Sequence, residues 1–326
     1  MKYIFFIIIL LTTFVFTIGC SEKMDAKNAE KQLKAFDSEL ILLAKQFSRS
    51  TAYQALQQLY SYKNLPVPYR FNANNGAQSI HTFDFEKQKG IYRLNNSTNE
   101  FYRHSTSDSI VIIFPYQSAH DSLARFVISQ YSESLSAWET MMPTCANISL
   151  DIKGKKEIQL LINGRMEHQV PVDYLASVQF EKIKADFSIR TKPGKNKSRM
   201  QTDLTVFSNN KQKASIKTSS LIKVLSNGTM LFDKVKFETT IFPLHISGFV
   251  NYGAIKHEKN SFVTEFNSNS KISIHEAQQN KKVGSVILSE RPMHDKINIA
   301  VVYNDGSTIF LEDLLLSIRE IMSIKL

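Results

Sequence analysis

Histidine, cysteine and carboxylate side chains could hold a metal ion, but their spacing in this chain matches no known ligand pattern. The eight histidines are scattered, and no pair has the spacing of metal ligands, at positions 81, 104, 120, 168, 245, 257, 275 and 294. His275-Glu276 begins like the helix of zinc proteases, but no second histidine follows at the required distance. We therefore expect no metal site, and we expect most histidines to be exposed or hydrogen-bonded singly.

Nucleophile motifs are equally weak. The pattern Ser-x-x-Lys occurs in segments of strand or turn character, at Ser208-Lys211, Ser220-Lys223 and Ser268-Lys271. A penicillin-binding arrangement needs this pattern at the start of a helix together with a Ser-Asp-Asn motif, which the chain lacks. The sequence also contains no Gly-x-Ser-x-Gly elbow and no glycine-rich phosphate loop.

No residue pattern in the sequence supports the other kinds of catalytic site. A pair of carboxylates for glycoside hydrolysis would come from distant strands, and nothing singles out such a pair. Cys145, with Met142, Ala146 and Ile148 nearby, is expected to be a buried and unreactive side chain. We therefore expect a protein without catalytic residues, metal or cofactor, and not an enzyme; a hydrolase is the least favoured alternative.

The N-terminus carries the clearest signal. Met1-Lys2 is basic, and Tyr3 to Ile18 is uncharged and rich in Ile, Leu and Phe. This stretch is short for a membrane span, which needs about 20 residues, and it fits the apolar region of a secretory signal peptide. It ends in Gly19-Cys20, followed at once by the polar residues Ser21-Glu22-Lys23. We expect residues 1–19 to be a signal peptide.

This ending resembles the lipobox of bacterial lipoproteins, in which a small residue precedes a cysteine that becomes lipidated and N-terminal. Gly19 and Cys20 match the pattern, whereas Thr17 stands where the family usually has leucine. The resemblance implies a lipid on Cys20 that anchors the protein to a membrane of the bacterial cell envelope, and several acyl chains would make this anchor durable. Ser21 in place of aspartate implies the outer membrane, with the face of that membrane left open.

The charge balance points to anionic neighbours. The formal net charge is +10, and only Lys2 of the basic residues belongs to the part expected to be removed. In an envelope, a basic surface suits lipid headgroups, lipopolysaccharide or acidic glycans, and solubility is an equally weighted explanation. Nucleic acid is not an expected partner, because an exported protein rarely meets it.

One basic segment is a candidate contact. Five residues surround Pro193-Gly194, a turn signal that predicts a hairpin tip: Arg190, Lys192, Lys195, Lys197 and Arg199. They could contact anionic headgroups or glycan, and the alternative is a solvated loop.

The first part of the mature chain has helical periodicity. Residues 24–49 place Leu33, Phe36, Leu40, Leu43 and Phe47 on one face of a helix. We favour packing of this face on the protein's own sheet over the alternative, contact with a membrane next to the anchor. A second short helix is expected at residues 51–60, before the prolines at 66 and 68.

From about Ser79 onward the period changes to two, which predicts antiparallel strands with one apolar and one wet face. Ile183 to Arg190 alternates strictly, and about a dozen strands are expected by this test. Turn signals separate them, among them Gly154-Lys155, Asn163-Gly164, Pro193-Gly194, Asn209-Asn210 and Asp305-Gly306. A terminal helix is expected from about Glu312 to Met322.

The predicted fold is α+β but mostly β: a large, curved, half-barrel-like antiparallel sheet with N-terminal helices and a short C-terminal helix. The expected organisation is a signal peptide at 1–19, an anchor with helices and linker at 20–78, and a β domain at 79–326.

This order of elements, over about Asp25 to Leu326, resembles the half-barrel envelope proteins, namely the lipoprotein carrier and receptor of the Lol type and the mycobacterial lipid-binding lipoproteins. The resemblance rests on element order and not on a motif. It implies a curved sheet around a hydrophobic cavity that holds acyl chains. Ile110 to Pro115 and Tyr303 to Ser307 also resemble segments of uncharacterised Bacteroidota lipoproteins, from which no activity carries over.

The sequence therefore leaves two main hypotheses. The favoured one is an envelope lipoprotein that binds a lipid or another amphiphile with its curved sheet. The alternative is a structural or adhesive surface lipoprotein that acts through contacts with an envelope protein partner.

Overall fold

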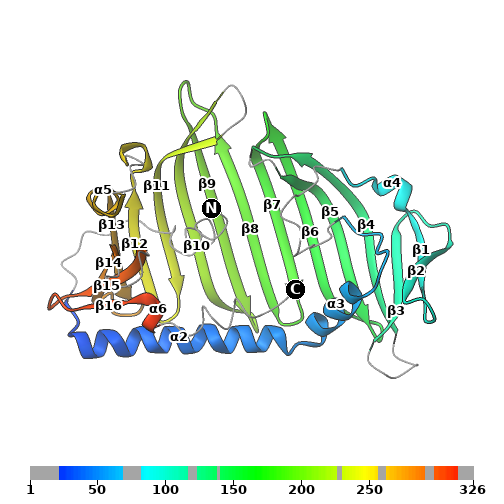
Figure 1. Cartoon of the computed structure of the whole chain (residues 1–326), viewed down its shortest axis with the longest axis horizontal. Helices are drawn as coiled ribbons and strands as arrows, with labels where there is room; N and C mark the ends of the chain where they lie inside the picture. The colour runs from blue at the N-terminus through cyan, green and yellow to red at the C-terminus, as the bar shows by residue number, and fades with distance from the viewer. Residues whose placement is uncertain are drawn as a thin grey trace. The chain divides into compact units, whose positions relative to one another are not determined.

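The structure is a computed structural model that describes residues 22–68, 82–116, 123–137, 140–225, 230–255, 262–290 and 297–314. Two helices come first, α2 (Ala26–Ser48) and α3 (Thr51–Ser61), and a short α4 (Phe85–Gln88) precedes the strands. Figure 1 shows these helices and the strands that follow them.

The strands follow one another along the chain with few interruptions. They are β1 (Gly90–Asn95), β2 (Glu100–Ser105), β3 (Ile110–Pro115), β4 (Leu123–Leu135), β5 (Met141–Ile152), β6 (Lys155–Glu167), β7 (Val170–Phe180), β8 (Ile183–Lys192), β9 (Ser198–Ser208), β10 (Lys211–Val224), β11 (Met230–Ile241), β12 (Leu244–Val250), β13 (Ser270–Glu276), β14 (Lys282–Glu290), β15 (Ile297–Tyr303) and β16 (Thr308–Phe310). The 3₁₀ turn η1 (Tyr252–Ala254) and α5 (Phe262–Ser268) separate β12 from β13, and α6 (Leu311–Leu314) follows β16.

The predicted fold class is confirmed. The strand order in the sheet is β16-β15-β14-β13-β12-β11-β10-β9-β8-β7-β6-β5-β4-β3-β1-β2. The open sheet is therefore a meander from β3 to β16, and β1 lies between β3 and β2 at its other end. The described strand pairs are antiparallel except for the parallel pair of β1 and β3. The described residues hold 16 strands, more than the dozen expected. Part of the predicted terminal helix is present as α6, and its continuation to Met322 lies outside the described residues.

One predicted turn is wrong. Asn163-Gly164 lies inside β6, and the chain turns instead at His168-Gln169, where both residues have positive φ angles. Gly164 is needed in the strand because the ring of Tyr174, directly opposite on β7, occupies the space a Cβ would take. By contrast, Asn209-Asn210 does turn the chain, with both residues in the left-handed region.

The described chain packs as two compact units, each built from interleaved segments. Unit 1 takes the described parts of Met1–Lys45, Thr191–Val206 and Gln212–Lys325, and unit 2 takes those of Gln46–Arg190 and Phe207–Lys211.

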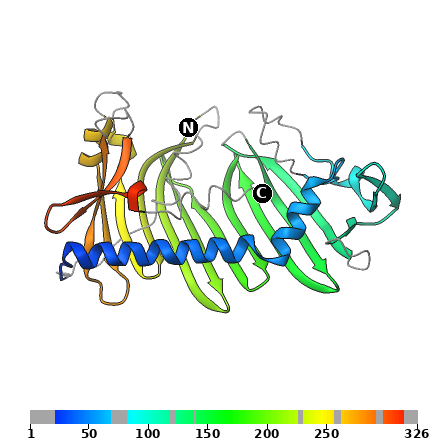
Figure 2. The same ribbon diagram turned by 60° about the horizontal axis from the view of Figure 1, so that its bottom comes forward.

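In unit 1, α2 packs on the sheet with the apolar stripe that the sequence predicts. Ala29, Leu33 and Phe36 join a core with Phe237 of β11, Leu244 of β12 and further side chains of β13 to β15. Figures 1 and 2 show α2 running across these strands. The Asp25 carboxylate accepts a hydrogen bond from the Asn28 backbone N–H at 2.9 Å, which caps the first turn of the helix. The favoured prediction for this stripe is therefore confirmed.

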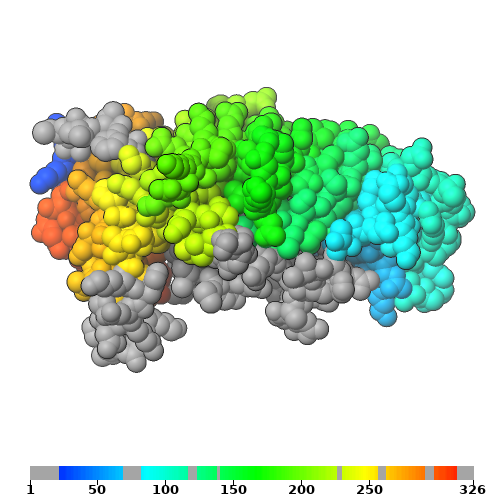
Figure 3. Space-filling model, turned by 90° about the horizontal axis from the view of Figure 1, so that it is seen from above, coloured from blue at the N-terminus to red at the C-terminus, as the bar shows by residue number. Residues whose placement is uncertain are grey.

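In unit 2, α3 packs against the first strands. Its N-cap is Ser50, whose hydroxyl accepts a hydrogen bond from the Tyr53 backbone N–H at 3.2 Å. The side-chain amide of Gln58 donates to the Pro115 carbonyl at 2.8 Å, and the ring of Tyr62, just after the helix, lies 5.5 Å from that of Phe101 on β2. In Figure 3 the strands of this unit extend from cyan and turquoise at one end to green at the other.

The packing of α2 predicts a large difference between two leucines of that helix. Leu33 is 2% exposed and Leu42 is 61% exposed. Leu33→Ala should lower the free energy of unfolding by about 2–5 kcal/mol, because it leaves a cavity in the core. Leu42→Ala, the matched control, should change it by less than about 0.5 kcal/mol. Urea unfolding measures both, and equal effects would contradict the packing of α2 described above.

Candidate functional site

The most distinctive surface of unit 2 is an apolar face formed by β5 to β8. Direct cross-strand pairing aligns its side chains in three rows of four. The first row is Leu150, Ile158, Phe180 and Ile183; the second is Ile148, Leu160, Val178 and Ala185; the third is Ala146, Ile162, Ala176 and Phe187. Every one of these residues is apolar, and together they are called the apolar face below.

The first row is largely covered. Leu150, Ile158 and Phe180 are buried. The ring of Phe47 lies 4.6 Å from that of Phe180 and 5.1 Å from that of Tyr53 on α3. Helix α3 is also held to the turn after β7, because the Glu181 carboxylate accepts a hydrogen bond from the Ala52 backbone N–H at 2.9 Å. The junction of α2 and α3 therefore closes this end of the apolar face.

The second and third rows remain partly exposed. All four residues of the second row, and all of the third except Ala146, keep an intermediate share of their surface accessible. In the core of unit 1, Phe237, Leu244 and Val301 are at most 1% exposed beneath α2. The two open rows therefore have apolar surface that packing within the fold does not remove from water.

The opposite face of the same strands is polar. Its corresponding rows are Ser149, Gln159, Gln179 and Lys184, and Asn147, Leu161, Ser177 and Asp186. Asp186 accepts a hydrogen bond from the Ser177 hydroxyl at 2.7 Å and pairs with Lys184 at 2.7 Å, which lowers the pKa of its carboxyl group. Leu161 and Leu175 are the exposed exceptions, at 43% and 47%. The alternation fixes which face could meet apolar matter and which meets water.

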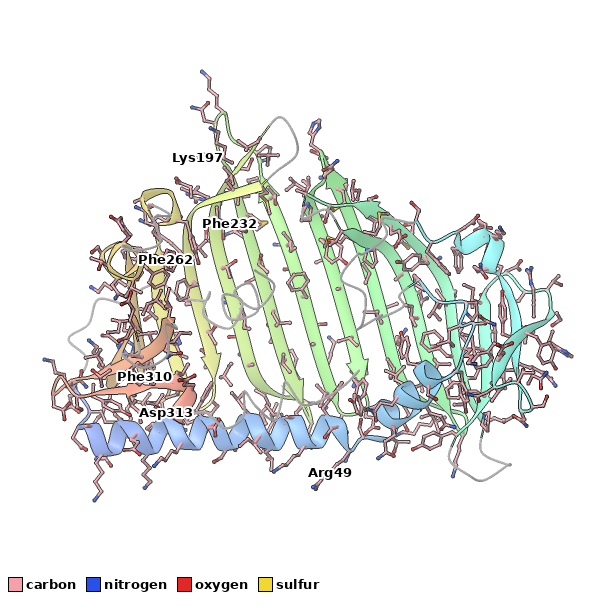
Figure 4. All side chains as sticks on the ribbon, viewed as in Figure 1. Arg49, Lys197, Phe232, Phe262, Phe310 and Asp313 are labelled. Atoms are coloured by element: carbon pink, nitrogen blue, oxygen red, sulfur yellow. The ribbon has the colours of Figure 1, made fainter. Side chains whose placement is uncertain are left out.

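The five basic candidate residues lie on β8, β9 and the loop between them, as predicted for a tip. All five are exposed. Lys197 is paired with the Asp233 carboxylate of β11 at 2.8 Å, so part of its charge is neutralised. Figure 4 places Lys197 beside the ends of the strands.

The predictions for the two cysteines have different outcomes. Cys20 lies outside the described residues, so its lipidation stays a prediction. The prediction that Cys145 is buried is wrong: it is partly exposed, and its Sγ lies 3.8 Å from Gln130 Oε1. The reason is alternation, because Cys145 pairs with Ser132 and Asn163 on the polar face while its neighbour Ala146 points to the apolar face.

Two of the histidines lie side by side in the sheet. His245 of β12 and His275 of β13 are directly opposite each other in unit 1. The Thr240 hydroxyl of β11 lies 3.1 Å from His245 Nδ1, and His275 Nδ1 is buried without a hydrogen-bond partner among the described residues. Burial lowers the pKa of both imidazoles, and their mutual repulsion and Lys282 lower that of His275 further. This pair could not be predicted from the sequence, because its proximity depends on strand register.

Among the described residues, no group of three or more His, Cys, Asp or Glu side chains is arranged to hold a metal ion. None of the described helices is both long enough and apolar enough to cross a membrane.

Comparison with known proteins adds no relative. No protein-family model, no curated protein sequence and no solved structure matches this chain.

Proposed function

We propose that the protein is an envelope lipoprotein, anchored through lipid on Cys20, which binds the acyl chains of an amphiphile on the apolar face of unit 2. The observation that carries this proposal is the partial exposure of two apolar rows on β5 to β8, in which every residue except Ala146 stays accessible to water. A soluble fold normally covers such a surface or uses it for binding.

The free energy gained by burying acyl chains indicates how many chains the ligand needs. Each buried methylene contributes about 0.8 kcal/mol, so ten methylenes of one acyl chain contribute about 8 kcal/mol. Association and the ordering of a flexible chain cost several kcal/mol of this amount. One chain would therefore bind weakly, and an amphiphile with two or more chains would stay bound through purification. The proposed ligand class is accordingly a lipid with several acyl chains.

The proposed anchor would hold unit 1 close to the membrane. The Glu22 carbonyl accepts a hydrogen bond from the Lys282 backbone N–H at 2.8 Å, and the Lys282 carbonyl accepts one from Met24 at 2.9 Å. The Asn304 side chain donates to the carbonyls of Met24 and Lys282, both at 2.8 Å. Only Ser21 separates this hydrogen-bonded segment from Cys20, and one residue spans about 3.5 Å. Such a short tether supports a role at the membrane surface.

The basic tip between β8 and β9 fits the same proposal. Each basic residue near an anionic surface adds about 1 kcal/mol of attraction. Contact of Arg190, Lys192, Lys195 and Arg199 with anionic headgroups or acidic glycan of the envelope is therefore proposed, with a smaller part for the ion-paired Lys197. The proposed location is the outer membrane, on either of its faces.

The second candidate function is a surface lipoprotein that acts through protein contacts. Leu161 and Leu175 favour it, because they lie on adjacent strands of the otherwise polar face and are both exposed. Two leucines make a small patch, well below the size of a stable interface, so this candidate ranks second.

The lipid-binding proposal predicts what the purified chain carries. The chain from Ser21 onward, expressed in a bacterial host, should retain lipid in stoichiometric amount, measured by mass spectrometry of organic extracts. Leu160→Gln places an amide in an open row and should lower retention roughly tenfold, because the amide loses hydrogen bonds to water against acyl chains. Leu161→Gln, one residue along on the polar face, should leave retention unchanged.

Two outcomes of that experiment would count against the proposal. A folded wild-type chain without any lipid would remove its basis and favour the protein-contact candidate. Equal losses in the Leu160 and Leu161 variants would show that retention does not depend on the apolar face.

The anchoring proposal has its own test. In a host that processes lipoproteins, the full chain should incorporate an alkyne-labelled fatty acid. Cys20→Ser should abolish the label and leave an unprocessed precursor of higher mass, whereas the control Cys145→Ser should keep both label and processing. A label that persists in the Cys20 variant would contradict lipidation at this residue.

A further inference from the structure

The sheet of unit 1 has a second face, opposite α2, on which strand pairing aligns the side chains in three rows. The first row is Ser215, Thr240, His245, His275 and Lys282; the second is Lys217, Glu238, Ser247, Ser273 and Ser285; the third is Ser219, Lys236, Phe249 and Lys271. Their neighbours along the strands, such as Phe237 and Ile272, lie in the core with α2. Alternation therefore places the three rows, called the outer face below, on the other side of the sheet.

The outer face is basic and partly open to water. Every residue of its rows is partly or fully exposed. Lys234 of β11 joins them, because its Nζ lies 4.8 Å from the centroid of the Phe249 ring. Five lysines thus stand on this face, namely Lys217, Lys234, Lys236, Lys271 and Lys282, and Glu238 is the one acidic residue of the three rows. The excess of positive charge attracts anions.

The shape and hydrogen-bonding groups of the outer face suit a phosphate-bearing surface. The lysines are spread from β10 to β14, and five strands at about 4.8 Å spacing span roughly 19 Å. Serine and threonine hydroxyls lie between the lysines, and both kinds of group donate hydrogen bonds to phosphate oxygens. An array of this width fits several headgroups side by side better than one small anion.

The proposed anchor begins at the edge of the same face. Lys282 ends the first row, and its backbone N–H and carbonyl are hydrogen-bonded to Glu22 and Met24. Lys281, the residue before it, is paired with the Glu22 carboxylate at 2.7 Å. Cys20 precedes Glu22 by two residues, which span at most about 7 Å. A lipid on Cys20 would therefore hold the outer face close to the headgroups.

The exposed side of α2 is the competing basic surface. Its lysines are interspersed with acids: Lys27, Lys31, Lys34 and Lys45 with Glu30 and Glu39. Lys34 is paired with Glu30 at 2.5 Å, and Glu39 lies 3.8 Å from Lys213 of β10. The charges of α2 therefore largely offset one another, and the outer face has the larger excess of positive charge.

We propose that the outer face of unit 1 lies on anionic phospholipid headgroups beside the anchor. This inference rests on the anchoring part of the proposed function and is independent of the apolar face of unit 2. The lysines contact the phosphates, and the partly exposed Phe249 stands among them. The anchor fixes the protein to the membrane, and the outer face sets which side of unit 1 is turned toward it.

Co-sedimentation with lipid vesicles tests the proposal. The chain from Ser21 onward, which has no anchor, should bind vesicles of phosphatidylcholine and phosphatidylglycerol but not vesicles of phosphatidylcholine alone. The double variant Lys217→Gln, Lys271→Gln should weaken this binding roughly twentyfold, since each lysine near an anionic surface contributes about fivefold. Raising the salt concentration should release the wild-type protein, because salt screens exposed charges.

The matched control is the double variant Lys27→Gln, Lys31→Gln, which removes the same charge from exposed positions of α2. It should bind the anionic vesicles nearly like the wild type. Equal losses in the two double variants would overturn the proposal, because they would show dependence on net charge alone. A larger loss in the α2 variant would assign the contact to α2 instead.

Two further outcomes would overturn the proposal. The first is equal binding of the wild-type chain to neutral and anionic vesicles, or binding to neither. The second is binding to an acidic polysaccharide such as polygalacturonate, lost in the Lys217 and Lys271 variant, without binding to vesicles. Because the vesicle assay uses a chain without its anchor, its result is separate from the labelling of Cys20 and from the retention of lipid by unit 2.

Discussion

A β-sheet has two faces, and a single layer of helices can cover only one of them. In this protein the sheet is a long meander in which the strands alternate apolar and polar side chains. Unit 1 covers the apolar side with α2, whose Leu33 and Phe36 are nearly inaccessible to water. In unit 2 the same pattern continues, but the second and third rows of the apolar face stay partly exposed. The partly exposed rows of unit 2 are therefore the candidate binding surface.

The open rows lie on regular strands and not on loops, which matters for binding. The middle of β6 and β7 is paired in a regular antiparallel register. The positions of Leu160 and Val178 are therefore fixed before any ligand binds. Under the proposed function, a preformed apolar surface without polar groups in its rows would select for acyl chains and not for a particular headgroup. Headgroup selectivity, where it exists, would have to come from charged residues beyond the rows, such as those of the basic tip.

Much of the fold follows from periodicity. The spacing of Leu33 and Phe36 identifies α2 and its buried face, and the alternation from Ile183 to Arg190 identifies β8. These patterns are local, so a single sequence contains them. The prediction of a turn at Asn163-Gly164 was wrong because glycine is required there by the ring of Tyr174 on the next strand. Local turn residues do not reveal such a long-range contact.

The candidate sites depend on register, and register is the part that the sequence leaves undetermined. A shift of one residue would move every side chain of a strand to the other face. The assignment of Cys145 to the polar face and of Ala146 to the apolar face could therefore not be derived from their neighbours in sequence. The same holds for His245 and His275, which only the pairing of β12 with β13 brings together.

The central claim is that acyl chains lie on the open rows of unit 2, and photo-crosslinking tests it most directly. The protein would be loaded with a two-chain phospholipid that carries a diazirine in one acyl chain, irradiated, digested and mapped by tandem mass spectrometry. The claim predicts adducts on partly exposed residues of the second and third rows, among them Leu160, Ile162, Val178 and Phe187. Adducts confined to Leu161 and Leu175 on the polar face, or scattered without preference, would contradict it.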